Sequence, residues 1–301
     1  MMFKKKVNKI QKPFGDKVLD FITSFLLVMV AIIVGYPVWY VIICSISNGD
    51  MIANGQVLIW PMGINFDGFK FVFSYSDVWL GFRNTLFYTV MGTIMSMVTQ
   101  IVCAWPIART KFRPRHVYTK IIVVTMLVNA GMIPNYLVKA SLGMVDTIWP
   151  ILIGGLIGSS DLFIIRTCYR SSIPNDLYDA AEIDGATEFQ ILFKIAVPLA
   201  KATISVITLY TIVGHWNSYW NAMIYLSNKQ LYPLAMFLRN ILKAGISADG
   251  AQDNDLAQQL SNAYEQIKYC LIIITTVPVL VAYASVQKFF KKGVMIGSVK
   301  G

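Results

Sequence analysis

The sequence predicts an all-α integral membrane protein with about six transmembrane helices. Its apolar residues fall in runs longer than about 18 residues, the length that a helix needs to cross about 30 Å of hydrocarbon. Only 14% of the 301 residues are charged, against about 25% in soluble domains. Lysines and arginines lie mainly at the ends of the apolar runs, so the net charge of +10 favours a lipid bilayer and argues against a nucleic-acid partner.

The first apolar run, 21–46, follows a basic amino-terminal tail, residues 1–20. A cleaved signal peptide is the alternative, but its apolar core would have only about 7–15 residues. We therefore interpret the run as an uncleaved first span. The remaining predicted spans are 85–108, 117–138, 147–165, 203–226 and 264–289, of which 147–165 is the weakest because Gly154, Gly155 and Gly158 interrupt it.

The positions of the basic residues predict the orientation of these spans. Most of the 26 lysines and arginines fall in the amino tail, in 109–120, in 166–201 and at the carboxyl end, segments that six spans would place on one side of the membrane. Because basic residues accumulate in cytoplasmic loops, we expect both termini in the cytoplasm, with a transmembrane domain at 21–289 and a tail at 290–301. The long segments 48–80 and 227–263 then lie outside.

The outer segment 227–263 is polar, with Asp249, Asp253 and Asp255, and we leave two interpretations open: a partner-binding surface or a solvated loop. The four cysteines, Cys44, Cys103, Cys168 and Cys270, are far apart and form no Cys-x-x-Cys pair. We read them as small apolar residues within spans, without a disulfide framework or a metal site.

Residues 171–199, between the fourth and fifth predicted spans, have the pattern of a short helix–turn–helix. Pro174 suits the first turn of a helix, and Asp184-Gly185 is a turn signal. Thr187 with Gln190 three residues later predicts a capping box at the start of a second helix. Pro198 should end or kink that helix before the fifth span. With most basic residues on this side, we expect the loop on the cytoplasmic face.

The same loop resembles the EAA loop of binding-protein-dependent ABC importer permeases. Asp179-Ala180-Ala181, Gly185, Ile195 and Pro198 match its order and spacing, with Asp179 for the usual glutamate and Val197 for the usual leucine. The likeness extends over nearly the whole chain and is greatest to the carbohydrate branch, in particular to permeases related to MalG and LplC. The supporting stretches are 131–136, 184–186, 215–221, 232–242 and 291–301.

The resemblance implies a type I ABC importer permease fold in the bacterial cytoplasmic membrane. It implies a complex with a second homologous permease, two ATPase subunits and an extracytoplasmic solute-binding protein, importing an oligosaccharide. The first short helix would be a coupling helix seated in a groove of the ATPase subunit. The residues that the resemblance assigns to ATPase coupling are Asp179, Ala180, Ala181, Asp184, Gly185, Ile195 and Pro198.

The sequence reveals no nucleotide-binding motif on this chain. The pattern G-x-x-x-x-G-K-[ST], whose loop holds phosphates, does not occur. We therefore expect no catalytic residues and no cofactor on this chain, with ATP and Mg²⁺ used by the partner ATPase. An amphipathic interfacial turn is the plainer interpretation of the 171–199 loop.

The fifth predicted span carries the candidate substrate pathway. Tyr210, Gly214, Asn217, Asn221 and Tyr225 follow a 4-3-4-4 spacing, which keeps them on one side of a helix. Asparagine within a span is costly unless it finds partners or lines a wet cavity, and aromatic rings suit sugars. Tyr219 and Trp220 lie alongside. Helix–helix hydrogen bonding, with the aromatic residues at the membrane interface, is an equal alternative.

Several further residues are weaker candidates. His215 has no second ligand at helical spacing, so we expect no metal there, and we interpret Asp161 as a headgroup-level or helix-end residue. Asn129 and Tyr136 are minor pathway candidates, and Arg239 and Lys243 are compatible with an acidic sugar. We interpret the remaining tryptophans as interfacial belts: Trp39, Trp60, Trp79, Trp105 and Trp149.

Three rival functions remain open from the sequence. An ABC permease for another solute, such as a peptide or phosphate, would share the loop. An ion-driven secondary transporter predicts intramembrane carboxylates and inverted repeats, which we do not find. A membrane enzyme would need a nucleophile–base or metal constellation, which is also not apparent.

Overall fold

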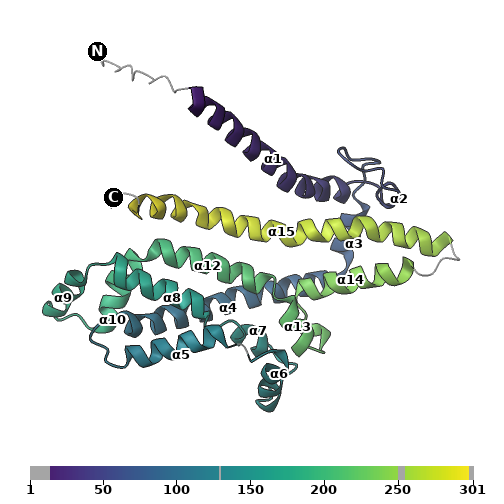
Figure 1. Ribbon diagram of the computed structural model, residues 1–301. Helices are drawn as coiled ribbons and strands as arrows, with labels where there is room; N and C mark the ends of the chain where they lie inside the picture. The colour runs from purple at the N-terminus through teal and green to yellow at the C-terminus, as the bar shows by residue number, and fades with distance from the viewer. Residues whose placement is uncertain (1–13, 129, 250–254, 298–301) are drawn as a thin grey trace.

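The computed structural model describes residues 14–128, 130–249 and 255–297, and all regular structure within these ranges is helical. The chain forms an elongated bundle in which α4 (Ser76–Ala108), α12 (Lys201–Trp216) and α15 (Asp255–Gly297) run side by side (Figure 1). Helix α1 (Phe14–Ser45) packs on α15 from outside the bundle. The amino end of α1, the carboxyl end of α15 and the helix α9 lie toward the same end of the molecule (Figure 1).

Shorter helices complete the bundle. They are α2 (Gly49–Ala53), α3 (Asp67–Ser74), α5 (Arg115–Leu127), α6 (Met132–Ser141), α7 (Trp149–Ile153), α8 (Ser159–Thr167), the π-helical η1 (Cys168–Ser172), α9 (Asn175–Ile183), α10 (Glu188–Ile191), the π-helical η2 (Leu192–Ala196), α11 (Val197–Leu199), α13 (Tyr219–Tyr225), the 3-10 helix η3 (Lys229–Leu231) and α14 (Leu234–Asp249).

Three helices of the described residues are long and apolar enough to cross a membrane: Phe14–Ser45, Ser76–Ala108 and Tyr264–Ser285. The number rises to five if each of two bent helix pairs counts as one span. One pair is α5 with α6, and the other joins Glu188–Leu199 to α12 with a bend of 83°. The all-helical membrane fold is therefore present, and the number of six spans stays a prediction.

Two of these helices begin earlier than the apolar runs suggested. The first starts at Phe14, inside the predicted 1–20 tail, and α4 starts at Ser76 rather than near residue 85. The additional turns carry polar residues at the ends of the spans, such as Asp16 and Asp77 in the first turns. An acidic side chain is favourable there because it meets the positive end of the helix dipole.

The predicted third and fourth spans are not continuous helices. Between α5 and α6 the helix is interrupted. Gly131 caps the start of α6 with φ of +81°, a conformation that favours glycine and does not occur within an α-helix. Between α7 and α8 the break contains the glycines at 154, 155 and 158, of which Gly154 ends one helix and Gly158 caps the next. Glycine has a high entropic cost in a helix, so these clusters become loops. The sequence candidate Asn129 lies outside the described residues.

The predicted fifth span, 203–226, is also divided, because α12 ends at Trp216 and α13 starts at Tyr219. Asn217 closes α12: its side-chain amide donates to the Val213 carbonyl at 3.0 Å, next to its own backbone N–H at 3.1 Å. An asparagine that hydrogen-bonds its own helix end competes with continuation of the helix. The prediction that one helix face carries all five pathway residues is therefore wrong, because Asn221 and Tyr225 lie on another helix than Tyr210 and Gly214.

The two segments predicted to lie outside also hold more regular structure than loops. Segment 227–263 contains α14 and the start of α15, so its interpretation as a simple solvated loop is wrong. Asp253 lies outside the described residues. Segment 48–80 is fixed to α15 by buried Gln266. The Gln266 amide donates to the Ser45 carbonyl at 3.3 Å and to the Asn65 side chain at 2.6 Å, and its oxygen accepts from the Gly68 N–H at 3.2 Å.

Candidate functional site: the 171–199 loop and its contacts

The 171–199 loop folds as the sequence predicts, into two short helices with a tight turn. Helix α9 has Pro174 at its N-cap, ends at Ile183 and has Asp184 at its C-cap. Gly185 follows with φ of +76°, which only glycine adopts without strain. Thr187 and Gln190 form the predicted capping box at the start of α10. After Pro198 the chain bends by 83° into α12, so the predicted kink is confirmed.

One face of α9 is buried within the chain itself. Tyr178 and Ala181 belong to an apolar core that includes Trp105 of α4, Tyr169 of η1 and Ile191 of α10. The Tyr178 hydroxyl donates to the Tyr169 carbonyl at 3.0 Å. Ala181 therefore faces this chain, which corrects the expectation that both alanines approach an ATPase subunit.

The opposite face of α9 is open. It presents Asp179, Ala180 and Asp184, together with the apolar side chains of Leu177 and Ile183. Ile183 is 86% exposed at the last helical position. Of the remaining predicted coupling residues, Gly185 and Pro198 are exposed and Ile195 packs partly on the core. A face that combines apolar and acidic side chains is suited to a protein partner.

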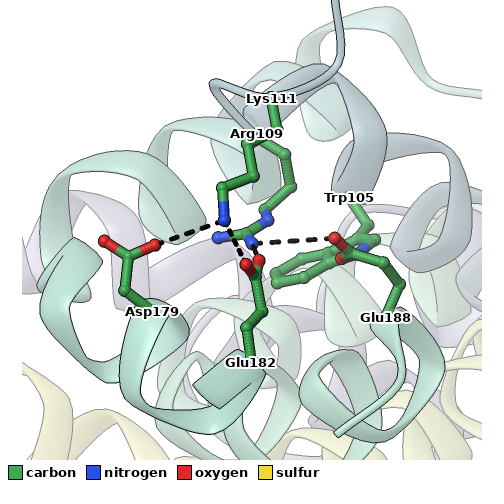
Figure 2. A network of polar contacts seen from close by, with 6 residues as sticks. All are labelled: Trp105, Arg109, Lys111, Asp179, Glu182 and Glu188. Carbon is green, nitrogen blue, oxygen red and sulfur yellow. Dashed lines mark hydrogen bonds and ion pairs between the residues drawn. The ribbon is translucent and has the colours of Figure 1, made fainter. Parts of the chain in front are cut away.

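The edge between the two faces carries a network of charged residues that reaches α4 (Figure 2). Arg109, directly after α4, pairs with Glu182 of α9 and lies 3.6 Å from Glu188 of α10. Lys111 pairs with the same Glu182 and lies 3.6 Å from Asp179. The network therefore joins the end of α4 to both short helices.

Arg109 is the most enclosed member of this network, with 7% of its side chain exposed. Its guanidinium carbon lies 5.3 Å from the ring centroid of Trp105 and 4.8 Å from that of Tyr178, so aromatic faces surround the cation. The Trp105 indole N–H donates to Glu188 at 2.8 Å. Trp105 is buried here, which corrects its assignment to an interfacial belt.

The charges shift one another's protonation. The hydrogen bond from Lys111, supported by the charge of Arg109, lowers the pKa of Glu182 below its ordinary value. The same hydrogen bond raises the pKa of Lys111. Burial raises the pKa of the Tyr178 phenol to about 12. At neutral pH the network therefore contains charged lysine and glutamate beside a neutral tyrosine.

Sequence reasoning missed Arg109, Lys111, Glu182 and Glu188 as site residues. The two basic residues entered only as part of the charge count on one side of the membrane. They lie about seventy positions before their partners, so no local spacing connects them. The available signal was Glu182 itself, which directly follows the Asp-Ala-Ala motif.

The predicted pathway residues separate into two groups. Tyr210, Gly214 and Asn221 line a cavity of about 320 Å³ together with Gln100, Asp161 and His215. Asp161 lies in the first turn of α8, in agreement with a helix-end residue. The other candidates lie outside this lining: Asn217 caps α12, Tyr225 is buried and stacks on Tyr136, and Tyr219 packs edge-on against Trp220 on the surface.

His215 is buried in this cavity wall, where its ring packs against Gly92 of α4. Among the residues that the structure describes, no group of three His, Cys, Asp or Glu side chains could hold a metal ion. The cysteines are unpaired, and Cys44 and Cys270 are buried in apolar clusters, as expected for small apolar residues.

The chain is similar over nearly its whole length to several known proteins. The chain is 33% identical to protein LplC of Bacillus subtilis over 98% of this chain and 99% of that protein. It is 32% identical to the polygalacturonan/rhamnogalacturonan transport system permease protein YtcP of the same organism, over 95% and 99%. A chain in the crystal structure of a bacterial ABC transporter involved in the import of the acidic polysaccharide alginate superposes with a TM-score of 0.82 and 31% identity, over 94% and 100%. No protein-family model matches the sequence.

Proposed function

Because the chain belongs to the carbohydrate branch of the binding-protein-dependent ABC importer permeases, we propose that α9 is the helix through which a separate ATPase subunit drives it. The chain is a sugar permease, a transport component rather than an enzyme. The observation that carries the proposal is the division of α9 into a face fixed to its own bundle and a face with exposed Leu177, Ile183 and Asp184.

The proposed drive follows from this division. ATP and Mg²⁺ bind at the ATPase pair, whose closure presses on the exposed face of α9. Since the other face is packed on Trp105 and Tyr169, the push moves helices of the bundle and rocks the permease between outward-open and inward-open states. Gly185 permits the turn that returns the chain to the bundle.

The proposed assembly pairs this chain with a second homologous permease, two ATPase subunits and an extracytoplasmic solute-binding protein. We place it in the bacterial cytoplasmic membrane with six spans, both termini cytoplasmic and α9 on the same side. The common end of α1, α15 and α9 supports this orientation (Figure 1).

We propose an oligosaccharide as substrate, and an acidic one in particular. Two similar proteins carry names that refer to acidic glycans: the polygalacturonan/rhamnogalacturonan permease and the alginate transporter. The cavity offers hydroxyl and amide groups from Tyr210, Gln100 and Asn221, which suit sugar hydroxyls. Asp161 in the same wall repels carboxylates, so we place the acidic groups of the sugar away from it.

The coupling proposal is tested by cysteine cross-linking in the complete transporter. The four native cysteines are replaced by serine or alanine, and Ile183→Cys is combined with single cysteines in the groove of the ATPase subunit. We expect a disulfide-linked pair that depends on the nucleotide state. The control is Asn54→Cys, an exposed residue that lies outside in the proposed orientation. Cross-links from position 54 but not from position 183 would overturn the proposal.

The substrate is tested by ATP hydrolysis in proteoliposomes with the solute-binding protein. We expect stimulation by oligogalacturonate or oligoalginate and less by neutral oligosaccharides of equal length. Stimulation by peptides alone would refute a carbohydrate substrate. Uptake that continues without any ATPase subunit would favour the ion-driven alternative.

A further inference from the structure

The junction between α4 and α9 contains a largely buried cation, Arg109. Arg109 is 7% exposed, yet it stands at the end of a helix that begins in the predicted outer region. A buried charge is tolerated only when it is paired and hydrogen-bonded. Its partners are Glu182 and Glu188, which belong to the two helices on either side of the Gly185 turn. Arg109 therefore links α4 to both arms of the loop.

The aromatic residues around Arg109 restrict its movement further. The Trp105 ring packs edge-on against Tyr178 at 5.3 Å and against Tyr169 at 5.7 Å. Both Trp105 and Tyr178 also present their rings to the guanidinium. If α9 moved away from α4, Arg109 would lose its partner Glu182 and the ring of Tyr178 together.

Lys111 makes a different contribution, although it contacts the same Glu182. Its side chain is 59% exposed, so water can replace its partners. It lies at the rim of the network, with Asp179 as its second neighbour (Figure 2). Lys111 thus provides a matched comparison for Arg109: the same carboxylate and the same charge, but little burial.

From these contacts, and given the ATPase coupling proposed above, we propose that Arg109 is a positioning residue that makes α9 and α4 move as one body. A push on α9 is then delivered directly to α4, which lines the polar cavity with Gln100 and packs on α12. Glu182, rather than the motif residue Asp179, is the carboxylate that holds α9 on its own chain. Asp179 stays on the exposed side, where a partner can reach it.

The test uses the complete transporter with spin labels on α9 and α4. Labels at Asp176→Cys and Val98→Cys, both exposed, report the distance between the helices in the nucleotide-free and the vanadate-trapped states. In the otherwise unchanged protein we expect the same distance in both states. In Arg109→Met we expect different distances, and transport per ATP should fall about tenfold, within the usual range of coupling energies.

Further variants separate positioning from general folding. Lys111→Met should keep both the distance and the transport per ATP close to the unchanged protein. Glu182→Gln keeps the shape of the side chain and its ability to form hydrogen bonds. It is the second variant to use if Arg109→Met does not assemble, and it should show the same loss of coupling. Arg109→Lys should restore part of it, because it keeps the charge without the planar contacts.

Two results would overturn the inference. One is a label distance that changes between nucleotide states in the unchanged protein as much as in Arg109→Met. The other is Arg109→Met and Glu182→Gln complexes that transport normally per ATP. The cross-link from Ile183→Cys is measured in parallel samples without spin labels. If it persists while these results appear, only the role of Arg109 fails, whereas its loss from the unchanged protein removes the ATPase contact itself.

Discussion

The contact between α4 and α12 depends on a glycine, and replacing it should weaken the protein. A Cβ on Gly92 would lie 2.5, 2.7 and 2.8 Å from three atoms of the His215 ring. Ordinary carbon contacts are about 3.5–4.0 Å, so the ring or the whole of α12 must retreat by about 1 Å. His215 is buried, and its ring cannot simply turn into solvent.

The magnitude of the Gly92→Ala effect follows from two opposing terms. Inserting a methyl group into a packed site costs about 1–3 kcal/mol. Replacing glycine by alanine within a helix returns about 1 kcal/mol. The difference is a net loss of up to about 2 kcal/mol in the free energy of unfolding. Gly214→Ala is the control, because a Cβ there meets nothing within 4 Å, and it should stabilise α12 by about 0.5–1 kcal/mol.

The assay is unfolding of the purified protein by SDS in mixed micelles, followed by tryptophan fluorescence. Gly92→Ala should unfold at a lower SDS fraction than the parent, and Gly214→Ala at a higher one. In a His215→Ala background, Gly92→Ala should become neutral or favourable, because the clashing ring is gone. If Gly92→Ala were as stable as Gly214→Ala, the packing of α4 on α12 described above would be incorrect.

Three further predictions concern transport, stability and pH dependence. Asn221→Leu, in the cavity wall, should reduce sugar uptake in proteoliposomes at least about tenfold more than Asn217→Leu, which caps a helix end; equal effects would contradict the assigned lining. Thr187→Ala removes one half of a capping box and should cost about 1 kcal/mol in the free energy of unfolding, visible in the same SDS titration, and an unchanged midpoint would count against this cap. Because its hydrogen bond with Lys111 lowers the pKa of Glu182, the pairs with Arg109 and Lys111 should persist through the ordinary carboxylate range and be lost only at lower pH. The α9–α4 label distance should therefore be constant from about pH 8 to 5; a change near pH 6 would disagree.

The structure of the 171–199 loop could be predicted from local signals in the sequence. The Thr187 capping box, the Gly185 turn and the bend after Pro198 each depend on residues within four positions of one another, and each is present. Such features follow from backbone geometry and short hydrogen bonds, which a sequence displays directly. The apolar runs likewise gave the long helices, since crossing a bilayer requires length and hydrophobicity.

Interruptions within apolar runs were harder to foresee. A hydropathy pattern does not indicate that the Asn217 side-chain amide donates a hydrogen bond to the Val213 carbonyl, or that Gly131 has a positive φ. The same applies to Arg109 and Glu182, which meet only because α4 and the loop pack together. Long-range pairing is a property of the tertiary structure, and one sequence gives no measure of it.

The two π-helical turns on either side of the loop have a mechanical meaning. Cys168–Ser172 precedes α9 and Leu192–Ala196 follows α10. A π turn holds one residue more than the α-helical turn it replaces, so each of these segments stores a short length of chain. Conversion of these π turns into α-helical turns would let α9 and α10 shift relative to α8 and α12 without unwinding either helix. The loop is thus joined to α8 and α12 by backbone segments that can change length, whereas the contacts of Arg109 join it firmly to α4.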